Sequence, residues 1–153
     1  MKKEFEIIDY EPRYLPDLKA VSLPWLEENG FFEPINLEQL EHPERVLASG
    51  GRIFLARAGE EIVGMIMLEL LGDGTCEPFK FGVKEAWRNR GIGHALMEAT
   101  LNAARELGQH TAVLTSNHNL TAALHIYESY GFRPKAHDHN LFQTADVTME
   151  LKL

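Results

Sequence analysis

The stretch FKFGVKEAWRNRGIGHALMEA, residues 79–99, decides how this chain folds and what it binds. Its first residues, up to Val83, are typical of the end of a β-strand, and a short polar connection follows them. From Gly91 to Leu107 apolar residues recur at spacings of three and four, which predicts a long amphipathic helix. Gly108 stands where a glycine is expected to end that helix. The stretch therefore predicts a strand, a glycine-containing loop and a helix in succession.

The loop between this strand and this helix has the features of an anion-binding site. It contains the pattern R-x-x-G-x-G from Arg88 to Gly93, and its two glycines permit tight turns that leave backbone N–H groups uncovered. The start of the helix adds unpaired N–H groups and the positive end of the helix dipole. From Lys80 to Gly93 the basic residues exceed the acidic ones by a charge of +3. We therefore expect a phosphate group to bind at this loop.

Two common nucleotide-binding motifs do not fit the loop. A Walker A motif requires Gly-Lys-Ser/Thr, whereas Gly93 is followed by His94 and Ala95. A dinucleotide-binding fingerprint requires a third glycine at the position of Leu96. A nucleotide-binding protein is therefore a disfavoured alternative, and a purely structural glycine turn is another.

The remaining sequence predicts an α/β fold with a mixed sheet. The expected order is strand, helices, three strands, helix, strand, helix and final strands. A tight hairpin at Gly59-Glu60 joins two of the strands, and prolines 12, 16 and 24 restrict the helices near the N-terminus. The expected strands cover residues 4–10, 52–58, 61–70, 76–83, 111–116 and 141–153, and the expected helices lie near 37–49, 91–107 and 120–130.

Length and composition predict one domain over residues 1–153, with an ordinary hydrophobic core. The single cysteine, Cys76, excludes an internal disulfide. No apolar run approaches the roughly 18 residues of a membrane span, and the first residues contain no signal-peptide core, so we expect a cytoplasmic protein. The formal net charge of -8 argues against binding to nucleic acid.

The chain resembles the Gcn5-related N-acetyltransferase (GNAT) family over nearly its whole length. The resemblance rests on the R-x-x-G-x-G loop and on a second hallmark, the helix end HIYESYGF, which contains Tyr127, Gly131 and Phe132. A bacterial branch of the family, whose substrates are mostly unassigned, is more similar still. Its further matches are Glu77, Lys80 and Val83 before the loop, Ser116-Asn117 before the second helix, and Met149-Glu150-Leu151 near the end.

The resemblance implies a single-domain α/β fold with a mixed, mostly antiparallel central sheet flanked by helices. It also implies acetyl-CoA as co-substrate, with no metal. Along the strand that ends at Val83, the expected contacts of the thioester and pantetheine are Phe81, Gly82 and Val83, and a free N–H near Phe81 would polarise the acetyl carbonyl. The residues whose backbone N–H groups would hold the diphosphate are Arg88, Asn89, Arg90, Gly91, Ile92, Gly93 and His94.

The resemblance also assigns Tyr127 as the acid that protonates the departing CoA thiolate. A phenol suits this task because it supplies a proton without first being charged. The competing interpretation is that Tyr127 only packs on the apolar face of its helix, beside Leu120 and Leu124.

Glu77 is the candidate base, because the acceptor amine must lose a proton before it can attack. Its position corresponds to that of the catalytic glutamate in the histone-acetyltransferase members of the family. Even spacing would put Glu77 on the same strand face as Phe81 and Val83, where apolar neighbours would make the carboxylate more basic. Pro78 would disturb this alternation. Glu69 on the neighbouring strand, or a chain of water molecules, is the competing base.

Other polar residues have weaker assignments. Asn117 is expected to contact the pantetheine, since Leu120 occupies the family's usual asparagine position, and Asn119 is expected to cap the second helix. His137-Asp138-His139 indicates a metal only weakly, and the chemistry needs none. Cys76 is expected to be a strand residue and not an acyl carrier.

Together these residues predict an N-acetyltransferase that transfers an acetyl group from acetyl-CoA directly to a primary amine of a small molecule or peptide. The acceptor stays open because residues 22–50 and 134–142, which would shape its pocket, match no motif; the acidity of the chain suits a cationic amine. The alternative is a non-catalytic acyl-CoA-binding sensor or interaction module. No nucleic-acid or membrane partner is expected, and homodimer formation and the use of other acyl groups stay open.

Overall fold

The structure is a computed structural model that describes residues 4–136 and 144–153. Its strands are β1 (Glu6–Asp9), β2 (Arg52–Ala58), β3 (Glu61–Gly72), β4 (Thr75–Val83), β5 (Thr111–Ser116), β6 (Arg133–Lys135) and β7 (Val147–Lys152). Its helices are α1 (Leu15–Glu28), α2 (Pro34–Glu41), α3 (Glu44–Ala48), α4 (Ile92–Glu106) and α5 (Thr121–Ser129), with short 3-10 helices η1 (Pro12–Tyr14) and η2 (Glu85–Trp87).

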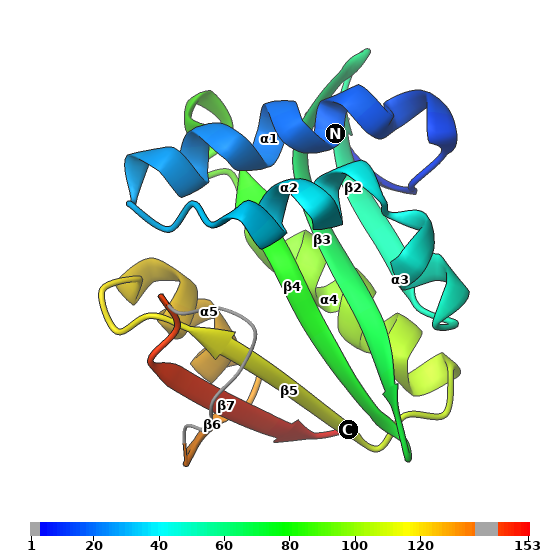
Figure 1. Cartoon of the computed structure of the whole chain (residues 1–153), viewed down its shortest axis with the longest axis vertical. Helices are drawn as coiled ribbons and strands as arrows, with labels where there is room; N and C mark the ends of the chain where they lie inside the picture. The colour runs from blue at the N-terminus through cyan, green and yellow to red at the C-terminus, as the bar shows by residue number, and fades with distance from the viewer. Residues whose placement is uncertain (1–3, 137–143) are drawn as a thin grey trace.

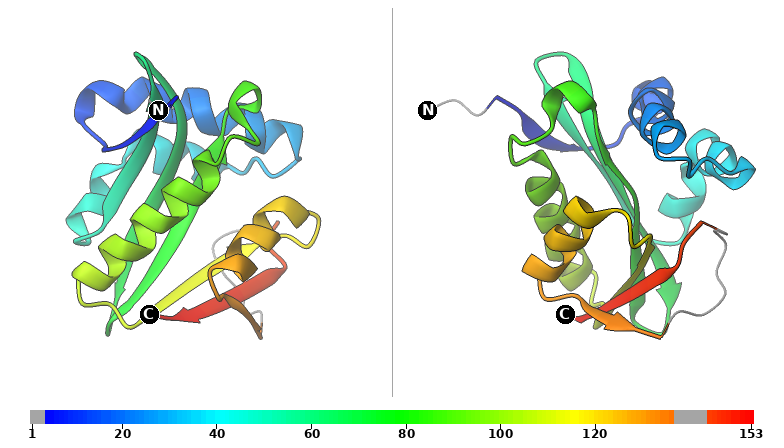
Figure 2. Two further views of the ribbon diagram at one scale, coloured as in Figure 1. Left: turned by 180° about the vertical axis from the view of Figure 1, so that it is seen from behind. Right: turned by 90° about the vertical axis from the view of Figure 1, so that its left-hand side faces the viewer.

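The strands of the described residues form one seven-stranded sheet in the order β1-β2-β3-β4-β5-β7-β6. Neighbouring strands are antiparallel except for β4 and β5, which are parallel. Helices α1, α2 and α3 cover one face of the sheet, and α4 and α5 cover the other (Figures 1 and 2). The predicted α/β class with a mixed, mostly antiparallel sheet flanked by helices is confirmed.

The alternation of side chains along the strands sorts the apolar residues into two cores. On β3, Met65 and Met67 point to the core under α1, α2 and α3, whereas Ile66 and Leu68 point to the core under α4. All four side chains are fully buried. The sheet is thus covered on both faces, and a site that reaches both cores must pass through an opening between strands.

Most predicted elements are confirmed, and the strands at 52–58 and 111–116 agree residue by residue. The single helix expected near 37–49 is wrong: His42 and Pro43 separate α2 from α3, because proline has no N–H to continue the helical ladder. Helix α1 has Pro16 in its first turn, where proline is tolerated, and continues through Pro24. The short strand β6 was not predicted. Of the strand expected at 141–153, residues 141–143 lie outside the described residues.

Strand β4 departs from regular geometry in two places, and both shape the site. Lys80 has a φ of +52°, and the pairing with β3 shifts by one residue between Met65 and Met67, which is the signature of a β-bulge. On its other edge β4 pairs with β5 only at Thr75 and Cys76. Beyond this short parallel contact the two strands diverge (Figure 1).

Helix α4 follows the loop that the sequence singled out. Gly91 precedes it with a φ of +84°, a left-handed conformation that glycine adopts without strain. Gly93 lies in its first turn, where a Cβ atom would come within 3.3 Å of both Ile126 on α5 and Phe81 on β4. The start of α4 therefore packs closely against the diverging end of β4. Among the described residues, no helix is both long enough and apolar enough to cross a membrane.

Candidate functional site

A pocket of about 120 Å³ opens where β4 and β5 diverge. Its walls come from helices on both sides of the sheet, so the opening connects the two faces. Its lining residues are Ser22, Trp25, Leu26, Phe31, Asn36, Pro78, Phe79, Lys80, Phe81, Thr115, Ser116, Asn117, Leu120, Tyr127, Thr144 and Ala145.

The free edge of β4 provides backbone groups for a strand-like ligand. Lys84 donates its N–H to the carbonyl of Val63 on β3 at 2.8 Å. Because backbone groups alternate along an antiparallel strand, Gly82 also faces β3, and Phe81 and Val83 direct their N–H and C=O groups toward β5. The carbonyl of Val83 accepts a hydrogen bond from Nε of Arg88 at 3.2 Å, which ties the loop to this edge. The candidate contacts Phe81 and Val83 thus lie on the open side of the strand, and Gly82 adds space because it lacks a side chain.

The start of α4 presents a set of backbone donors. The helical hydrogen-bond ladder begins with the N–H of Ala95 on the carbonyl of Gly91, at 3.0 Å. The N–H groups of Ile92, Gly93 and His94 come before this bond and are therefore left for another acceptor. The Cβ position of Gly91 has no atom within 4 Å, so the approach to these donors is open. The carbonyl of His94 accepts a hydrogen bond from the hydroxyl of Tyr130 at 2.8 Å, which fixes the first turn against α5.

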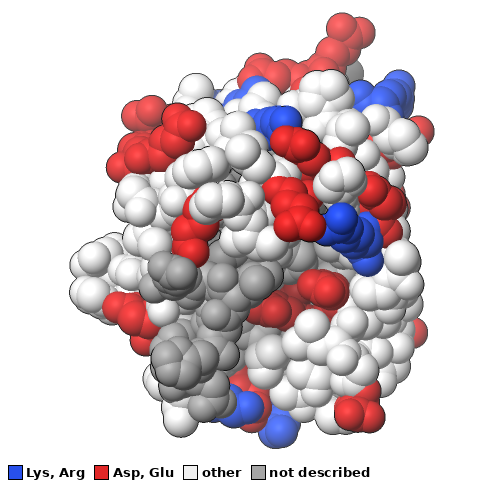
Figure 3. Space-filling view, viewed as in Figure 1, with Lys and Arg blue, Asp and Glu red and all other residues white. Residues whose placement is uncertain are grey.

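The net charge of +3 counted from Lys80 to Gly93 is offset in the fold by ion pairs with carboxylates. The expectation of a basic patch at the loop was therefore wrong. Carboxylates from distant parts of the chain pair with the basic side chains around the loop. On the described part of the α1–α3 face, acidic groups also lie beside basic ones (Figure 3). Attraction for a phosphate therefore rests mainly on backbone N–H groups and the helix dipole. The ion pairs are Lys84–Glu61 at 3.2 Å, Arg88–Glu28 at 3.6 Å and Arg90–Glu4 at 3.1 Å.

Tyr127 both packs in the core and lines the pocket. Its side chain is 8% exposed, and its ring lies 6.1 Å from that of Phe81 and 6.0 Å from that of Phe132. Burial raises the pKa of the phenol above its usual value, so the hydroxyl stays protonated. No other described residue hydrogen-bonds to this hydroxyl, so it is available as a donor.

The sequence placed Glu77 on the same face as Phe81 and Val83, and this prediction was wrong. The bulge at Lys80 adds one residue to β4 and reverses the alternation that follows it. Phe79, two residues after Glu77, packs in the core under α1, α2 and α3, whereas Phe81 and Val83 pack in the core under α4. Glu77 is also absent from the described lining of the pocket.

Glu77 nevertheless has the protonation behaviour of a base. Its pKa is raised to about 7, mainly because burial disfavours the charged form and further because of the negative charge of Glu69. Glu69 is its direct cross-strand neighbour on β3. The positive charge of Lys80 opposes the shift. The two candidate bases thus lie side by side on the α1–α3 face.

Lys80 lines the pocket, a role that the sequence did not predict. Its Nζ donates to Oδ1 of Asn36 on α2 at 2.6 Å. Burial lowers the pKa of the ammonium group to about 8, although the charges of Glu33 and Glu77 favour the protonated form. Its signals in the sequence were the Glu-x-x-Lys-x-x-Val pattern and the basic stretch from Lys80 to Gly93, and neither says where the side chain points.

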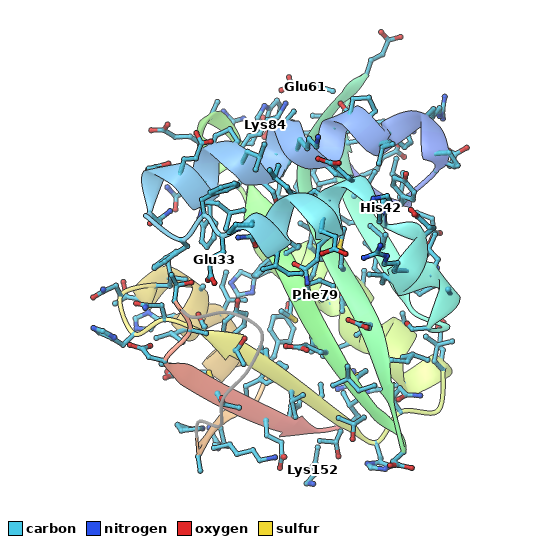
Figure 4. The ribbon with its side chains drawn as sticks, viewed as in Figure 1. Glu33, His42, Glu61, Phe79, Lys84 and Lys152 are labelled. Atoms are coloured by element: carbon cyan, nitrogen blue, oxygen red, sulfur yellow. The ribbon has the colours of Figure 1, made fainter. Side chains whose placement is uncertain are left out.

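Asn117 lines the pocket, but its amide is already engaged. Its Nδ2 donates to the carbonyl of Thr144 at 2.8 Å, and its Oδ1 accepts the N–H of Asn119 at 2.9 Å. Asn119 was predicted to cap α5, and this was wrong: the N-cap is Leu120, which has no side-chain cap, and Asn117 forms the local turn instead. Thr144 also donates through its N–H and hydroxyl to Glu33, which lies in front of the sheet between α1 and α2 (Figure 4).

The sequence also raised the questions of a cysteine acyl carrier and of a metal site. Cys76 is a buried residue of β4, and burial raises the pKa of its thiol to about 11, which makes it a poor nucleophile. Among the described residues, no group of three or more side chains is arranged to hold a metal ion. The motif His137-Asp138-His139 lies outside the described residues.

Comparison with known proteins also indicates an acetyltransferase. The family model of the acetyltransferase (GNAT) domain matches residues 49–134. YvbK of Bacillus subtilis (strain 168), an uncharacterized N-acetyltransferase, is 30% identical over 92 residues, which cover 60% of this chain and 59% of YvbK. The chain therefore matches less than two thirds of the length of this curated relative.

Solved structures share the fold at low sequence identity. A GNAT-family acetyltransferase from Staphylococcus aureus Mu50 superposes with a TM-score of 0.86 at 23% identity, over 97% of this chain and 98% of that chain. The PaiA N-acetyltransferase of Thermoplasma acidophilum, solved in complex with coenzyme A, superposes with a TM-score of 0.79 at 17% identity, over the whole of both chains. At these identities the likeness is one of fold.

Proposed function

Because the chain belongs to the GNAT acetyltransferase family, we propose that it is an N-acetyltransferase that transfers an acetyl group from acetyl-CoA directly to a primary amine of a small molecule or peptide. The observation that carries the proposal is the pocket between β4 and β5, which joins the free edge of β4 to a buried tyrosine. A cytoplasmic location is part of the proposal.

The residues around this opening fit acetyl-CoA. The N–H groups of Ile92, Gly93 and His94 suit a diphosphate, and Arg88 to Gly91 shape the turn that exposes them. The edge groups of Phe81 and Val83 suit the amides of the pantetheine arm. The complex of the Thermoplasma acidophilum relative with coenzyme A supports the same ligand class. No metal is needed for this chemistry.

The transfer requires two proton movements, and one candidate residue serves each. The acceptor amine loses a proton, its nitrogen forms a bond to the acetyl carbon, and the bond between that carbon and sulfur breaks. Tyr127 would donate the proton that the departing thiolate takes up. Glu77, with its pKa of about 7, would accept the proton from the amine through water, because it does not line the pocket itself.

The residues that line the pocket restrict the kind of acceptor that can bind favourably. Their described residues include one charged side chain, the cationic Lys80, and no carboxylate. Aromatic side chains make up much of the wall on the α1 side, where Trp25 and Phe31 pack with ring centres 6.0 Å apart. A polycation would gain no ion pair from these walls, so we propose an amine on a largely apolar body. This replaces the cationic acceptor that the acidity of the sequence suggested.

The test is a screen for release of CoA thiol from acetyl-CoA with amino acids, polyamines, aminoglycosides and peptides. We expect turnover with amino acids and peptides that carry apolar side chains, and loss of turnover in Tyr127→Phe. If acetyl-CoA raises the melting temperature but no amine releases thiol, the chain is an acyl-CoA-binding module instead. If ATP or NAD raises the melting temperature and acetyl-CoA does not, the proposal fails.

A further inference from the structure

Ser116, the last residue of β5, has a buried hydroxyl without a partner among the described residues. The residue is 8% exposed, and its Oγ makes no hydrogen bond with any described residue. A buried hydroxyl left unpaired costs about 1–3 kcal/mol, so such a group calls for an explanation. Two other buried atoms in the described part of the chain share this property, on Gln39 and Gln109, but neither residue lines the pocket.

The side chain of Ser116 lies on the face of the sheet that also carries Tyr127. Ala112 and Leu114 point into the core that contains α4 and Tyr127, and Ser116 has the same parity along the strand. Ser116 and Tyr127 both line the pocket. The backbone of Ser116 pairs with Val147 of β7, and its carbonyl accepts the N–H of Asp146, the residue before β7, at 2.9 Å. Two residues whose hydroxyls lack partners among the described residues, one from β5 and one from α5, therefore line the same pocket.

The leaving group of the proposed reaction needs more than one donor. A thiol has a pKa of about 8.5, below that of an ordinary phenol at about 10. Burial raises the pKa of Tyr127 further, so proton transfer from its phenol to a thiolate is uphill. A second hydrogen bond to the sulfur would stabilise the negative charge while the carbon–sulfur bond breaks.

We infer that the Ser116 hydroxyl donates a hydrogen bond to the CoA sulfur beside the Tyr127 hydroxyl, which makes Ser116 a further catalytic residue. The inference rests on the proposed function, because it requires CoA in this opening. Ser116 keeps its own proton throughout. The proton that converts thiolate to thiol comes from Tyr127, and the proton lost by the amine restores the phenol through solvent.

The experiment compares CoA with desulfo-CoA, which lacks the thiol, so it needs no acceptor. Calorimetry measures the dissociation constants of both ligands at pH 6.5 and pH 9 for the wild type and Ser116→Ala. At pH 9 the bound thiolate should lose about tenfold in affinity in Ser116→Ala, the size expected for one hydrogen bond to a charged group. Desulfo-CoA binding should not change, and the loss for CoA should be smaller at pH 6.5.

Two variants and one stability measurement complete the test. Ser129→Ala removes an exposed serine hydroxyl that donates to the carbonyl of Ile126 at 2.6 Å, and it should bind both ligands like the wild type. Ser116→Thr keeps a hydroxyl and should recover most of the affinity for CoA. The melting temperature of Ser116→Ala should stay the same or rise, because the removed group has no partner among the described residues.

Each remaining outcome counts against the inference. Equal losses for CoA and desulfo-CoA would assign Ser116 to the pantetheine arm or to packing, and unchanged binding of CoA would remove any role at the sulfur. A Thr variant as weak as the Ala variant toward CoA alone would mean that the hydroxyl is not responsible. A wild type that binds neither ligand would overturn the proposed function itself, and the Ser116 inference with it.

Discussion

The two edges of strand β4 have different partners and different roles. Along the β3 edge, pairing runs from Thr75 to Val83 and shifts register at two places, beside the hairpin and at the bulge around Lys80. Along the β5 edge, pairing stops after Thr75 and Cys76. The first edge holds the strand in register, and the second leaves backbone groups and a pocket for a ligand. One short strand thus combines structural support with a binding surface.

The bulge at Lys80 extends this division to the two faces of the strand. Glu77 lies before the bulge and faces the α1–α3 side, whereas Phe81 lies after it and faces the side of α4 and Tyr127. In the proposed reaction, the base and the acid therefore act from opposite faces of the sheet. The comparison predicts that variants on the two faces change different parts of the catalytic cycle.

The largest effect is expected for Tyr127→Phe, on the α5 side. We expect kcat to fall about 100-fold or more, because the thiolate loses its proton donor, while the dissociation constant of acetyl-CoA stays nearly constant. Steady-state kinetics and calorimetry measure the two quantities. Tyr14→Phe is the matched control, since Tyr14 is equally buried at 8% exposed but packs in the other core. A Tyr127→Phe enzyme with normal kcat at every pH would end the acid role.

The next largest effect is expected for Glu77→Gln, on the opposite face. We expect kcat/KM to fall at least about tenfold. In the wild type the rate should rise with pH through about 7, because the carboxylate must be ionised to accept a proton, and this limb should vanish in the variant. Glu69→Gln removes a charge that raises the pKa of Glu77, so it should move the limb to lower pH with little loss of rate. If Glu69→Gln is the more damaging of the two, Glu69 is the base.

Regular elements could be predicted from the sequence, whereas the bulge in β4 could not. Strand 111–116 and helix 91–107 were predicted because their periodicity is local. The bulge was not, because it depends on the register with β3 and requires a lysine, Lys80, in a left-handed conformation that is uncommon for that residue. Consequently the face of Glu77 was assigned wrongly.

Long-range pairing explains the other failures. The partners of the basic loop residues come from elements far away in the chain, as in the pair Arg90–Glu4, so a count along the sequence could not include them. The contact of Glu33 with Thr144 links residues 111 positions apart. Tyr127 was identified as a candidate because a helix motif with a fixed spacing carries it, and the structure places it in the pocket lining. Ser116 belonged to a quoted motif, but only the fold shows that its hydroxyl lacks a partner among the described residues.

A smaller effect on acetyl-CoA binding is expected for a substitution at the start of α4, and the same substitution at the end of the helix is its control. Gly91 and Gly108 both have left-handed backbones, with φ of +84° and +76°, and neither Cβ position has an atom within 4 Å. Alanine should therefore lower the free energy of unfolding by about 1–2 kcal/mol at either position. Only Gly91→Ala should also weaken acetyl-CoA binding, by severalfold, because it changes the turn that exposes the phosphate donors. Equal binding by both variants would remove the loop from the diphosphate site.

The smallest effect is on the free energy of unfolding, and it tests the buried charges of Glu77 and Lys80. The pKa of Glu77 rises from 4.5 to about 7 on folding, so between these values the folded state holds more protons than the unfolded chain, and stability falls as pH rises. The pKa of Lys80 falls from 10.5 to about 8, so stability rises again with pH above about 8. Stability should therefore pass through a minimum between pH 7 and 8. Glu77→Gln should raise the free energy of unfolding there by about 1 kcal/mol and flatten the decline below it. Urea unfolding from pH 5 to pH 10 measures the curve, and a wild type that is most stable near pH 7.5 would show that Glu77 is not held in a desolvated site.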